Sequence, residues 1–331
     1  MRHIIIAAAA ALAAGGASPA LAGTNTPTKP IEIKYHANGP WAVATVATPA
    51  GCDGAGNVCD IYYPADLGKN GYRHPIVAWA NGTGETPVSP ATYAYYLRHL
   101  ASWGFVVIAT RNGQTGYGDP VVASIAYLKA RNADAASPFY NKLATARVGT
   151  VGHSQGATGA INAMLKANAA SPGAVRTAVS FHIARQSFCN PADLCLLTKD
   201  LTAAKSGSIL YVSGTGDPII SPDQQMGGDK LDSNTAYYNA TPAPLLKAKA
   251  MLKGPGLLDA GPSHNDVQGN PTCAGASSFC NNGVDGYLGY PTAWLMWQLA
   301  DATDGRDAFK APGGEIFSET TNWKSVLSNV P

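Results

Sequence analysis

The sequence predicts an α/β protein with a mostly parallel central sheet and helices on both faces. Short apolar runs alternate with longer segments of helical spacing, as in folds where helices connect parallel strands. Glycine-rich polar turns follow several of the apolar runs. Charged residues make up 13% of the chain and apolar residues 46%, which is typical of a compact globule and excludes a disordered chain.

The expected elements follow from these patterns. Strands are predicted over residues 31–35, 42–48, 60–63, 75–79, 105–109, 147–151, 175–181, 209–213 and 245–252. Helices are predicted over residues 90–103, 121–130, 154–168 and from 291 onward. Parallel sheets bind ligands beyond the carboxyl ends of their strands, so reactive side chains should lie in the loops that follow strands.

The first 22 residues have the pattern of a signal peptide. A basic Arg2 precedes an apolar run over residues 4–14, and Ala20-Leu21-Ala22 matches the small-x-small cleavage pattern. The alternative is a membrane anchor, which this short run disfavours. We expect cleavage after Ala22 and an exported protein, extracellular or periplasmic, without stable membrane insertion.

The charge distribution excludes some partners. The net charge is +2, and lysines and arginines are scattered along the chain. The chain lacks the basic stripe of nucleic-acid-binding proteins and the polybasic patch of membrane-surface proteins. Because no repeat or linker-like stretch interrupts it, we expect one domain over residues 23–331, present as a monomer.

The cysteines fall into three close pairs, which are Cys52/Cys59, Cys189/Cys195 and Cys273/Cys280. An even number of cysteines in an exported chain favours disulfides, and pairing of neighbouring cysteines would close one short loop with each disulfide. A metal site is the alternative, but no Cys-x-x-Cys spacing supports it. We therefore expect disulfides and no metal or other cofactor.

Gly152-His153-Ser154-Gln155-Gly156 lies between a predicted strand and a predicted helix. The pattern Gly-x-Ser-x-Gly is weak evidence alone, but a strand before it and a helix after it are its expected context. Such a turn places the serine hydroxyl above the sheet and aims the helix N-terminus at it. Ser154 is therefore the predicted nucleophile.

A serine nucleophile needs a general base, and His264 is the best candidate among the seven histidines. It lies in a loop between the last predicted strand and the C-terminal helix. His153 adjoins the nucleophile in a tight turn and is expected to be a packing residue. His182 follows a predicted strand and is expected to line the cleft without acting as the base.

Asp217 is the predicted orienting acid. It follows the apolar run 209–212 and precedes His264, the order expected in a strand-end triad of serine, acid and histidine. Its carboxylate would hold the histidine in the correct tautomer. The backbone N–H groups of Gln155 and Thr83 are the predicted oxyanion donors, the latter in the turn after residues 75–79.

Several segments together resemble a known family. They are Gly82-Thr83, residues 100–108, residues 152–156, Gly216-Asp217 and Ser263-His264. In this order they resemble the cutinase-like polyester (PET) hydrolases and related secreted lipases of the α/β-hydrolase superfamily, over roughly residues 75–300. The resemblance implies the α/β-hydrolase fold, an open cleft and hydrolysis of hydrophobic esters, including polyesters.

The chain departs from that family at the cleft. Gln155 stands where those hydrolases commonly have methionine, and Thr83 and His182 stand near positions where aromatic rings contact the substrate. Tyr117 and Phe188 are the candidate replacements. The segment from Asp217 to His264 is longer than in the family, which indicates an added loop or a partial lid.

These inferences predict a serine carboxylic-ester hydrolase that works through an acyl-enzyme. A triacylglycerol lipase, a small-acyl deacetylase and a peptidase are alternatives within the fold, because a fold does not determine the substrate. A non-catalytic binding protein on the same scaffold is an alternative from a different class.

Overall fold

The computed structural model describes residues 25–83, 89–224, 230–254, 261–268 and 278–331, with only the backbone over 278–285. The predicted signal peptide lies outside these ranges. None of the helices in the described ranges combines the length and apolar character that crossing a bilayer requires.

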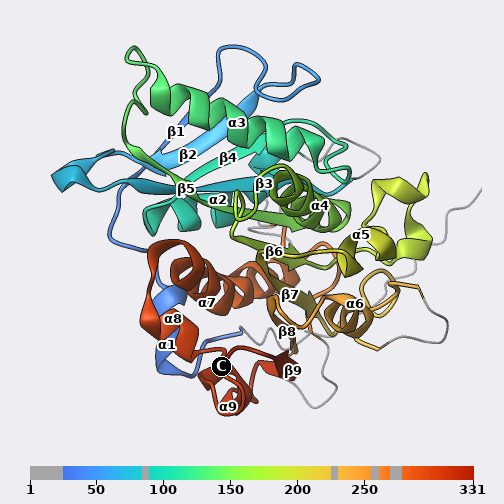
Figure 1. Ribbon diagram of the computed structural model, residues 1–331. Coiled ribbons are helices and arrows are strands. Elements are labelled where there is room, and N and C mark those ends of the chain that lie inside the picture. The colour runs from blue at the N-terminus through green and yellow to red at the C-terminus, as the bar shows by residue number, and fades with distance from the viewer. Residues whose placement is uncertain (1–24, 84–88, 225–229, 255–260, 269–277) are drawn as a thin grey trace, which may run out of the picture.

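One nine-stranded sheet organises the described part of the chain, with strand order β1-β2-β4-β3-β5-β6-β7-β8-β9 (Figure 1). Strands β3 to β8 are parallel, whereas β1, β2 and β9 join the sheet antiparallel at its two sides. The strands are β1 (Val43–Ala47), β2 (Cys59–Pro64), β3 (His74–Ala80), β4 (Val106–Thr110), β5 (Leu143–His153), β6 (Thr177–Phe181), β7 (Ser208–Gly214), β8 (Leu246–Leu252) and β9 (Trp323–Ser328). The predicted α/β class is confirmed.

Helices cover both faces of the sheet (Figure 1). They are α1 (Pro30–His36), α2 (Ala94–Ser102), α3 (Asp119–Ala133), α4 (Gln155–Ala170), α5 (Thr198–Thr202), α6 (Asn234–Ala240), α7 (Ser278–Ala300), α8 (Thr303–Asp307) and α9 (Glu315–Ser318). Short 3₁₀ turns lie at Lys69–Gly71, Pro90–Tyr93, Gln186–Phe188 and Ala192–Leu194.

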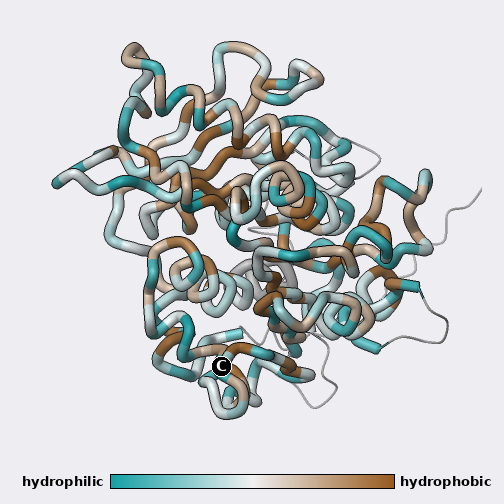
Figure 2. Tube along the Cα trace, viewed as in Figure 1, coloured by the Kyte–Doolittle hydropathy of each residue, from teal (hydrophilic) through white to brown (hydrophobic). Residues whose placement is uncertain are grey.

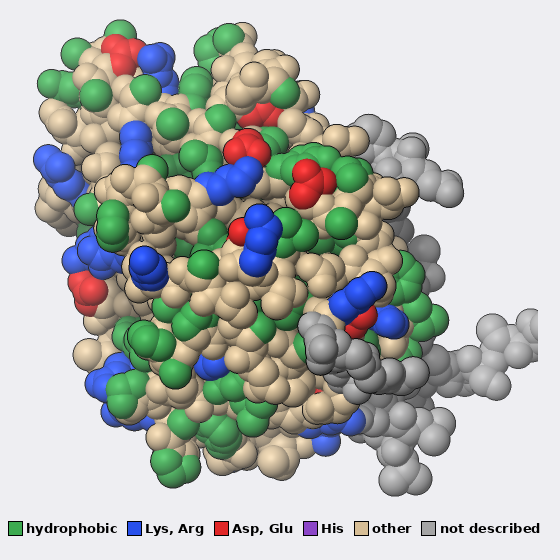
Figure 3. All heavy atoms as spheres, turned by 45° about the vertical axis from the view of Figure 1, so that its right-hand side comes forward, with side chains coloured by type: hydrophobic (Ala, Val, Ile, Leu, Met, Phe, Trp, Pro, Cys, Tyr) green, Lys and Arg blue, Asp and Glu red, His purple; other side chains and the backbone are tan. Residues whose placement is uncertain are grey.

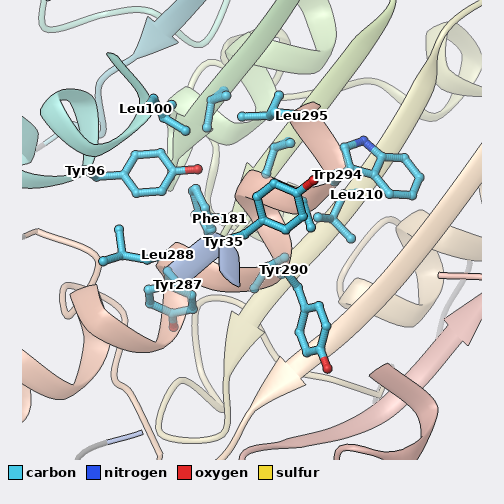
Figure 4. Packing of buried hydrophobic residues seen from close by; sticks show 14 of the residues in the cluster. Tyr35, Tyr96, Leu100, Phe181, Leu210, Tyr287, Leu288, Tyr290, Trp294 and Leu295 are labelled. Atoms are coloured by element: carbon cyan, nitrogen blue, oxygen red, sulfur yellow. The ribbon is translucent and has the colours of Figure 1, made fainter. Parts of the chain in front are cut away.

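Alternate side chains of the buried strands enter two separate cores. Val77 and Trp79 face one core with helices α1, α2 and α7, whereas Ile76 and Ala78 face the other with α3, α4 and α6. Figure 4 shows the first core, where aromatic rings such as Tyr96 and those of helix α7 pack against strand residues. Figure 2 shows the apolar strands at the centre of the molecule. Burial on both faces explains why these strands read as continuous apolar runs.

The predicted strand over residues 31–35 is wrong, because this segment is helix α1. Pro30 occupies its first turn, and Glu32 and Tyr35, three residues apart, are both buried. A proline in the first turn and an i, i+3 buried pair are helical features that outweigh the apparent alternation.

The C-terminal region also differs from the prediction. Helix α7 begins at Ser278, and Pro291 lies inside it rather than at its start. The prediction did not include strand β9, which pairs antiparallel with β8. Asp304 in helix α8 accepts a hydrogen bond from Tyr35 in helix α1 at 2.7 Å.

Candidate active site

Ser154 occupies a sharp turn between strand β5 and helix α4. Its φ of 58° and ψ of −126° lie in a backbone region that residues other than glycine rarely adopt. The backbone N–H of Ser154 donates to the carbonyl oxygen of Phe181 at 2.9 Å, which ties the turn to the end of strand β6. The strained conformation is therefore supported by the neighbouring strand, a pattern found at functional sites.

Two glycines make this turn possible through close approach of backbone segments. A Cβ atom at Gly152 would collide with the carbonyl group of Gly156. A Cβ atom at Gly156 would collide with the carbonyl groups of Ala80 and Asn81, at the end of strand β3. The glycines thus let helix α4 start directly above strands β3 and β5.

Three predicted residues form one hydrogen-bonded chain. Nε2 of His264 lies 2.8 Å from Oγ of Ser154, and Nδ1 of His264 lies 2.6 Å from Oδ2 of Asp217. Asp217 follows strand β7, and His264 lies in the segment after strand β8. The three come from different parts of the chain and meet at the carboxyl edge of the sheet, as expected for a parallel sheet.

A family model of PET hydrolase-like proteins matches residues 18–185 of the chain. The chain belongs to the PET hydrolase-like family. Membership supports hydrolysis of ester bonds and agrees with the observed α/β architecture. A search among curated proteins found no match.

The match to the PET hydrolase-like model ends before two of the three residues in the hydrogen-bonded chain. It includes Ser154, whereas Asp217 and His264 lie beyond residue 185. The grouping of Asp217 and His264 with Ser154 therefore rests on the geometry of this chain. Their roles remain predictions that the geometry supports.

The carboxylate of Asp217 is buried and well supplied with donors. Oδ1 accepts the backbone N–H of Ile220 at 3.1 Å, and Oδ2 faces the Nδ1 atoms of His182 and His264 at 2.8 Å and 2.6 Å. Burial acts to raise the pKa of Asp217, but the hydrogen bonds from His182 and His264 outweigh it and lower the pKa. Asp217 is thus ionised throughout the neutral range.

His182 does not line the cleft, which corrects the sequence-based expectation. Its side chain is 0% exposed, with Nδ1 on Asp217 and Nε2 hydrogen-bonded to the hydroxyl of Tyr287. The reason is topological, because β6 lies between β5 and β7 in the sheet. His182, which follows β6, is thereby placed in contact with Asp217, which follows β7. The position of His182 directly after a predicted strand was the sequence signal for a site residue. Its contact with Asp217 depends on the order of strands in the sheet, which the sequence does not give.

His153 is buried, in agreement with its predicted packing role, and it contacts the loop of His264. Its Nε2 atom lies 2.8 Å from the carbonyl oxygen of His264, and its Nδ1 atom lies 2.9 Å from the hydroxyl of Tyr93. Burial lowers the pKa of His153, with a further contribution from the charge of His264. A neutral His153 therefore donates from Nε2 to the carbonyl and accepts at Nδ1 from Tyr93.

The predicted oxyanion donors lie on neighbouring segments. Gln155 is the first residue of helix α4, where backbone N–H groups have no partner within the helix. Thr83 is exposed and follows strand β3, which pairs in parallel with β5 so that Ala80 lies opposite Gly152. The turn after β3 and the turn containing Ser154 are thus adjacent, and the donor roles of Thr83 and Gln155 remain predictions.

The side chain of Gln155 is buried beneath neighbouring loops. A Cβ atom at Gly116 would collide with the Cγ atom of Gln155 and with the carbonyl oxygen of Leu194. The glutamine thus lies against the Gly116 turn and the loop that carries the Cys189–Cys195 disulfide.

The two aromatic candidates for the cleft differ in exposure. Phe188 is 54% exposed, and the Arg185 guanidinium lies 5.4 Å from the centre of its ring. Tyr117 is half-buried. Ile219, two residues after Asp217, is 64% exposed, and its carbonyl oxygen accepts a hydrogen bond from Arg185 at 3.2 Å. Arg185 thus connects the Phe188 loop with the Asp217 loop.

Two of the three predicted disulfides lie within the described residues. Cys52 pairs with Cys59 and Cys189 pairs with Cys195, with Cα–Cα distances of 5.8 Å and 5.7 Å. Cys273 lies outside the described residues, and the side chain of Cys280 is likewise undescribed.

One group of metal-capable side chains lies within the described ranges, formed by His182, Asp217 and His264. Their ligand atoms are already 2.6 Å and 2.8 Å apart through hydrogen bonds. Two ligands of a tetrahedral zinc ion would be separated by about 3.3 Å. The group therefore fits a hydrogen-bonded carboxylate better than a metal site.

Charged side chains are thinly spread over the surface that Figure 3 presents. Lysines, arginines, aspartates and glutamates lie singly or in small mixed groups between apolar and uncharged residues. This face therefore carries no continuous field of one sign that would attract a strongly charged polymer.

Proposed function

We propose that the protein is a secreted serine carboxylic-ester hydrolase that cleaves hydrophobic esters, including polyesters, through an acyl-enzyme. The observation that carries the proposal is the continuous hydrogen-bonded chain Ser154–His264–Asp217, at 2.8 Å and 2.6 Å, at a strained strand-to-helix turn. Nucleophile, base and orienting acid within hydrogen-bond reach form the constellation that activates a serine hydroxyl.

In the acylation step, Oγ of Ser154 attacks the ester carbonyl carbon while its proton passes to Nε2 of His264. The carbonyl oxygen becomes an oxyanion, and the N–H groups of Thr83 and Gln155 are proposed to bind it. Collapse of this intermediate breaks the ester C–O bond, and the leaving alkoxide takes the proton from His264. The acyl group remains attached to Ser154, and the alcohol is free.

In the deacylation step, water attacks the acyl carbonyl and gives its proton to His264. The second tetrahedral intermediate then expels Oγ of Ser154, which recovers the proton. The carboxylic acid is released, and the enzyme returns to its starting state. Asp217 keeps its negative charge throughout and stabilises the imidazolium form of His264 in each step.

Exposed apolar residues on two linked loops, one of which carries Asp217, support a hydrophobic polymer as substrate. Phe188 and Ile219 are 54% and 64% exposed, and Arg185 links their loops. Exposed apolar groups of this size, on the Asp217 loop and on the loop linked to it, suit contact with a hydrophobic surface. Membership of the PET hydrolase-like family supports the same substrate class.

Export is part of the proposal. Two disulfides suit an oxidising compartment, and the leader pattern at residues 1–22 supplies a route to it. We propose that the mature chain, residues 23–331, acts as one monomeric domain. N-terminal sequencing of the secreted protein tests the cleavage site, and sedimentation analysis tests the monomer.

Replacing Ser154 with alanine tests the mechanism. We expect Ser154→Ala to lower kcat on p-nitrophenyl butyrate by roughly 10⁴-fold or more, because the nucleophile is lost while binding remains. Ser171→Ala, at an exposed helix end, is the matched control and should retain activity. Retention of wild-type activity in Ser154→Ala would refute the proposal.

A substrate panel separates the alternatives. Tributyrin emulsion, acetylated sugars, a peptide and polyester film are assayed with wild-type and Ser154→Ala protein. A rate increase at the oil–water interface would favour a lipase, and acetyl esters as the best substrates would favour a deacetylase. Absence of fluorophosphonate labelling would favour a non-catalytic binding protein.

A further inference from the structure

We propose that His182, assisted by Tyr287, is a positioning residue that holds the Asp217 carboxylate for His264. The proposal rests on the proposed function, because it assigns a role around the same triad. Ser154, His264 and Asp217 form the usual chain of contacts, and His182 adds a second imidazole to the carboxylate of Asp217.

The geometry places two imidazole rings on one carboxylate oxygen. Oδ2 of Asp217 lies 2.8 Å from Nδ1 of His182 and 2.6 Å from Nδ1 of His264. The two rings are perpendicular, with centroids 5.6 Å apart, so they approach the oxygen from different directions. The carboxylate is therefore clamped between them.

The ionisation states follow from the donors and acceptors present. An ionised carboxylate only accepts hydrogen bonds, so both Nδ1 atoms must carry a proton. Burial lowers the pKa of His182, although its hydrogen bond with Asp217 acts in the opposite direction. Neutral His182 then has a lone pair on Nε2, which accepts a hydrogen bond from the hydroxyl of Tyr287.

Tyr287 completes the hydrogen bonding of the His182 tautomer that Asp217 requires. Burial raises the pKa of Tyr287, so its hydroxyl stays protonated and can donate. If the Nδ1 proton of His182 moved to Nε2, a lone pair on Nδ1 would face the carboxylate of Asp217, which only accepts hydrogen bonds. Asp217 therefore selects the tautomer, and Tyr287 satisfies Nε2 and orients the ring, as partners beyond the reacting groups do in other sites.

Among the described residues, few other titratable groups surround the two rings. His182 is faced by Asp217, His264, His153 and Tyr287, and the carboxyl group of Asp266 contributes to its electrostatic environment. His264 is faced by Ser154 and by His153, His182 and Asp217. Removing the His182 donor therefore acts mainly through the Asp217 charge.

The loss of this donor has two expected consequences. The carboxylate gains freedom to rotate away from His264, which lowers kcat more than it changes KM. Its negative charge is also no longer shared between two donors, so it favours the protonated form of His264 more strongly. The acid limb of the profile of kcat/KM against pH should therefore move to higher pH.

Two near-isosteric substitutions test the proposal. His182→Leu removes the donor and should lower kcat roughly 10- to 100-fold, with the acid limb displaced upward. His182→Asn keeps an N–H group near the position of Nδ1 and tolerates the φ of 48° at this residue, so it should recover most of kcat and the wild-type pH profile. Equal losses in both variants with an unchanged pH profile would mean a merely structural role and would overturn the proposal.

Tyr287→Phe keeps the backbone at residue 182 untouched and removes only the partner of Nε2. It should displace the acid limb in the same direction as His182→Leu, by a smaller amount. Thermal unfolding of each variant shows whether it is folded. A folded His182→Leu protein with wild-type kcat and pH profile would refute the proposal even if Tyr287→Phe were impaired.

Proton NMR provides a readout that does not need activity. Wild-type protein should show two low-field imidazole N–H signals from the rings that share Asp217, and His182→Leu should show one. Two signals in a protein that hydrolyses no ester would leave the clamp in place and reject the proposed function. An active wild-type protein with one signal in this region would reject the clamp and keep the function.

Discussion

The hydroxyl of Tyr93 joins two segments that meet at the active site. The backbone N–H of Gly82 donates to it at 3.1 Å, and it in turn donates to Nδ1 of His153. His153 then holds the carbonyl oxygen of His264. A single buried side chain thus connects the turn after strand β3, which carries Thr83, with the loop of the proposed base.

Tyr93→Phe tests this connection. It leaves the N–H of Gly82 and Nδ1 of His153 buried without their partner, which costs about 1–3 kcal/mol for each unsatisfied group. We expect a lower melting temperature and a decrease in kcat of roughly 10-fold, because the loop around Gly82 and the backbone of His264 lose their common anchor. Circular dichroism melting and ester hydrolysis provide the measurements.

Tyr140→Phe is the matched control, since Tyr140 is 42% exposed. It should leave both stability and kcat within experimental error of wild type. If Tyr93→Phe behaved like Tyr140→Phe, the chain from Gly82 to His264 would have no role in holding the site.

At the scale of elements, the turn between strand β5 and helix α4 depends on backbone contact. Helix α4 begins against the end of strand β3, and Gly156 touches the carbonyl groups of Ala80 and Asn81 closely enough to exclude a side chain. The strand-to-helix turn that carries the proposed nucleophile is therefore also a packing contact among three elements.

Gly156→Ala should destabilise this turn. The added Cβ must displace backbone atoms, and overpacking of this kind costs about 1–3 kcal/mol. The displaced helix start also moves the N–H of Gln155, which is proposed to bind the oxyanion. The decrease in kcat should therefore be larger than the change in KM. Chemical denaturation and steady-state kinetics check both effects.

Gly54→Ala provides the comparison, because a Cβ at Gly54 would meet no atom within 4 Å. It should be neutral in both assays. A Gly156→Ala protein as stable and active as Gly54→Ala would contradict the account of the turn.

At the scale of the whole molecule, the two ends of the described chain meet through buried glutamates. Glu32 of helix α1 accepts a hydrogen bond from Nε1 of Trp323 in strand β9 at 2.6 Å. Glu315 accepts the backbone N–H of Glu32 at 2.9 Å, and Glu319 lies nearby. Burial, followed by the charges of Glu319 and Glu315, raises the pKa of Glu32 to about 8 despite the hydrogen bond from Trp323.

This pKa makes stability depend on pH in a defined direction. The pKa of Glu32 is raised from 4.5 in the unfolded reference to about 8 in the folded protein. Between these values the folded state retains a proton that the unfolded state has released. The free energy of unfolding should therefore fall as pH rises from about 4.5 to about 8, by at most about 1.4 kcal/mol per pH unit from this group.

Glu32→Gln should remove this slope, because the amide has no charge to bury. We expect the variant to match wild type near pH 4.5 and to exceed its stability at pH 8.5, measured by urea denaturation. Asp66→Asn, at an exposed site, is the control and should keep the wild-type slope. The same slope in Glu32→Gln as in wild type would show that Glu32 is not the group responsible.

Local patterns in the sequence predicted much of the sheet and the reactive serine. Strands buried on both faces form apolar runs, so β3 to β8 were all expected from their composition. Ser154, Asp217 and His264 were predicted because each follows a strand, and a parallel sheet brings such loops to one edge. Helix α1 was mistaken for a strand because a segment this short carries little periodicity.

The sequence by itself thus determined the fold class, the family and the order of the three proposed triad residues. Only the tertiary structure decided the role of His182, because the position of β6 between β5 and β7 turns this residue toward Asp217 and away from the cleft. The tertiary structure also decided the contact between Tyr287, in helix α7, and His182. Hydrogen bonds between residues this far apart depend on strand order and helix packing, and local sequence patterns do not encode these contacts.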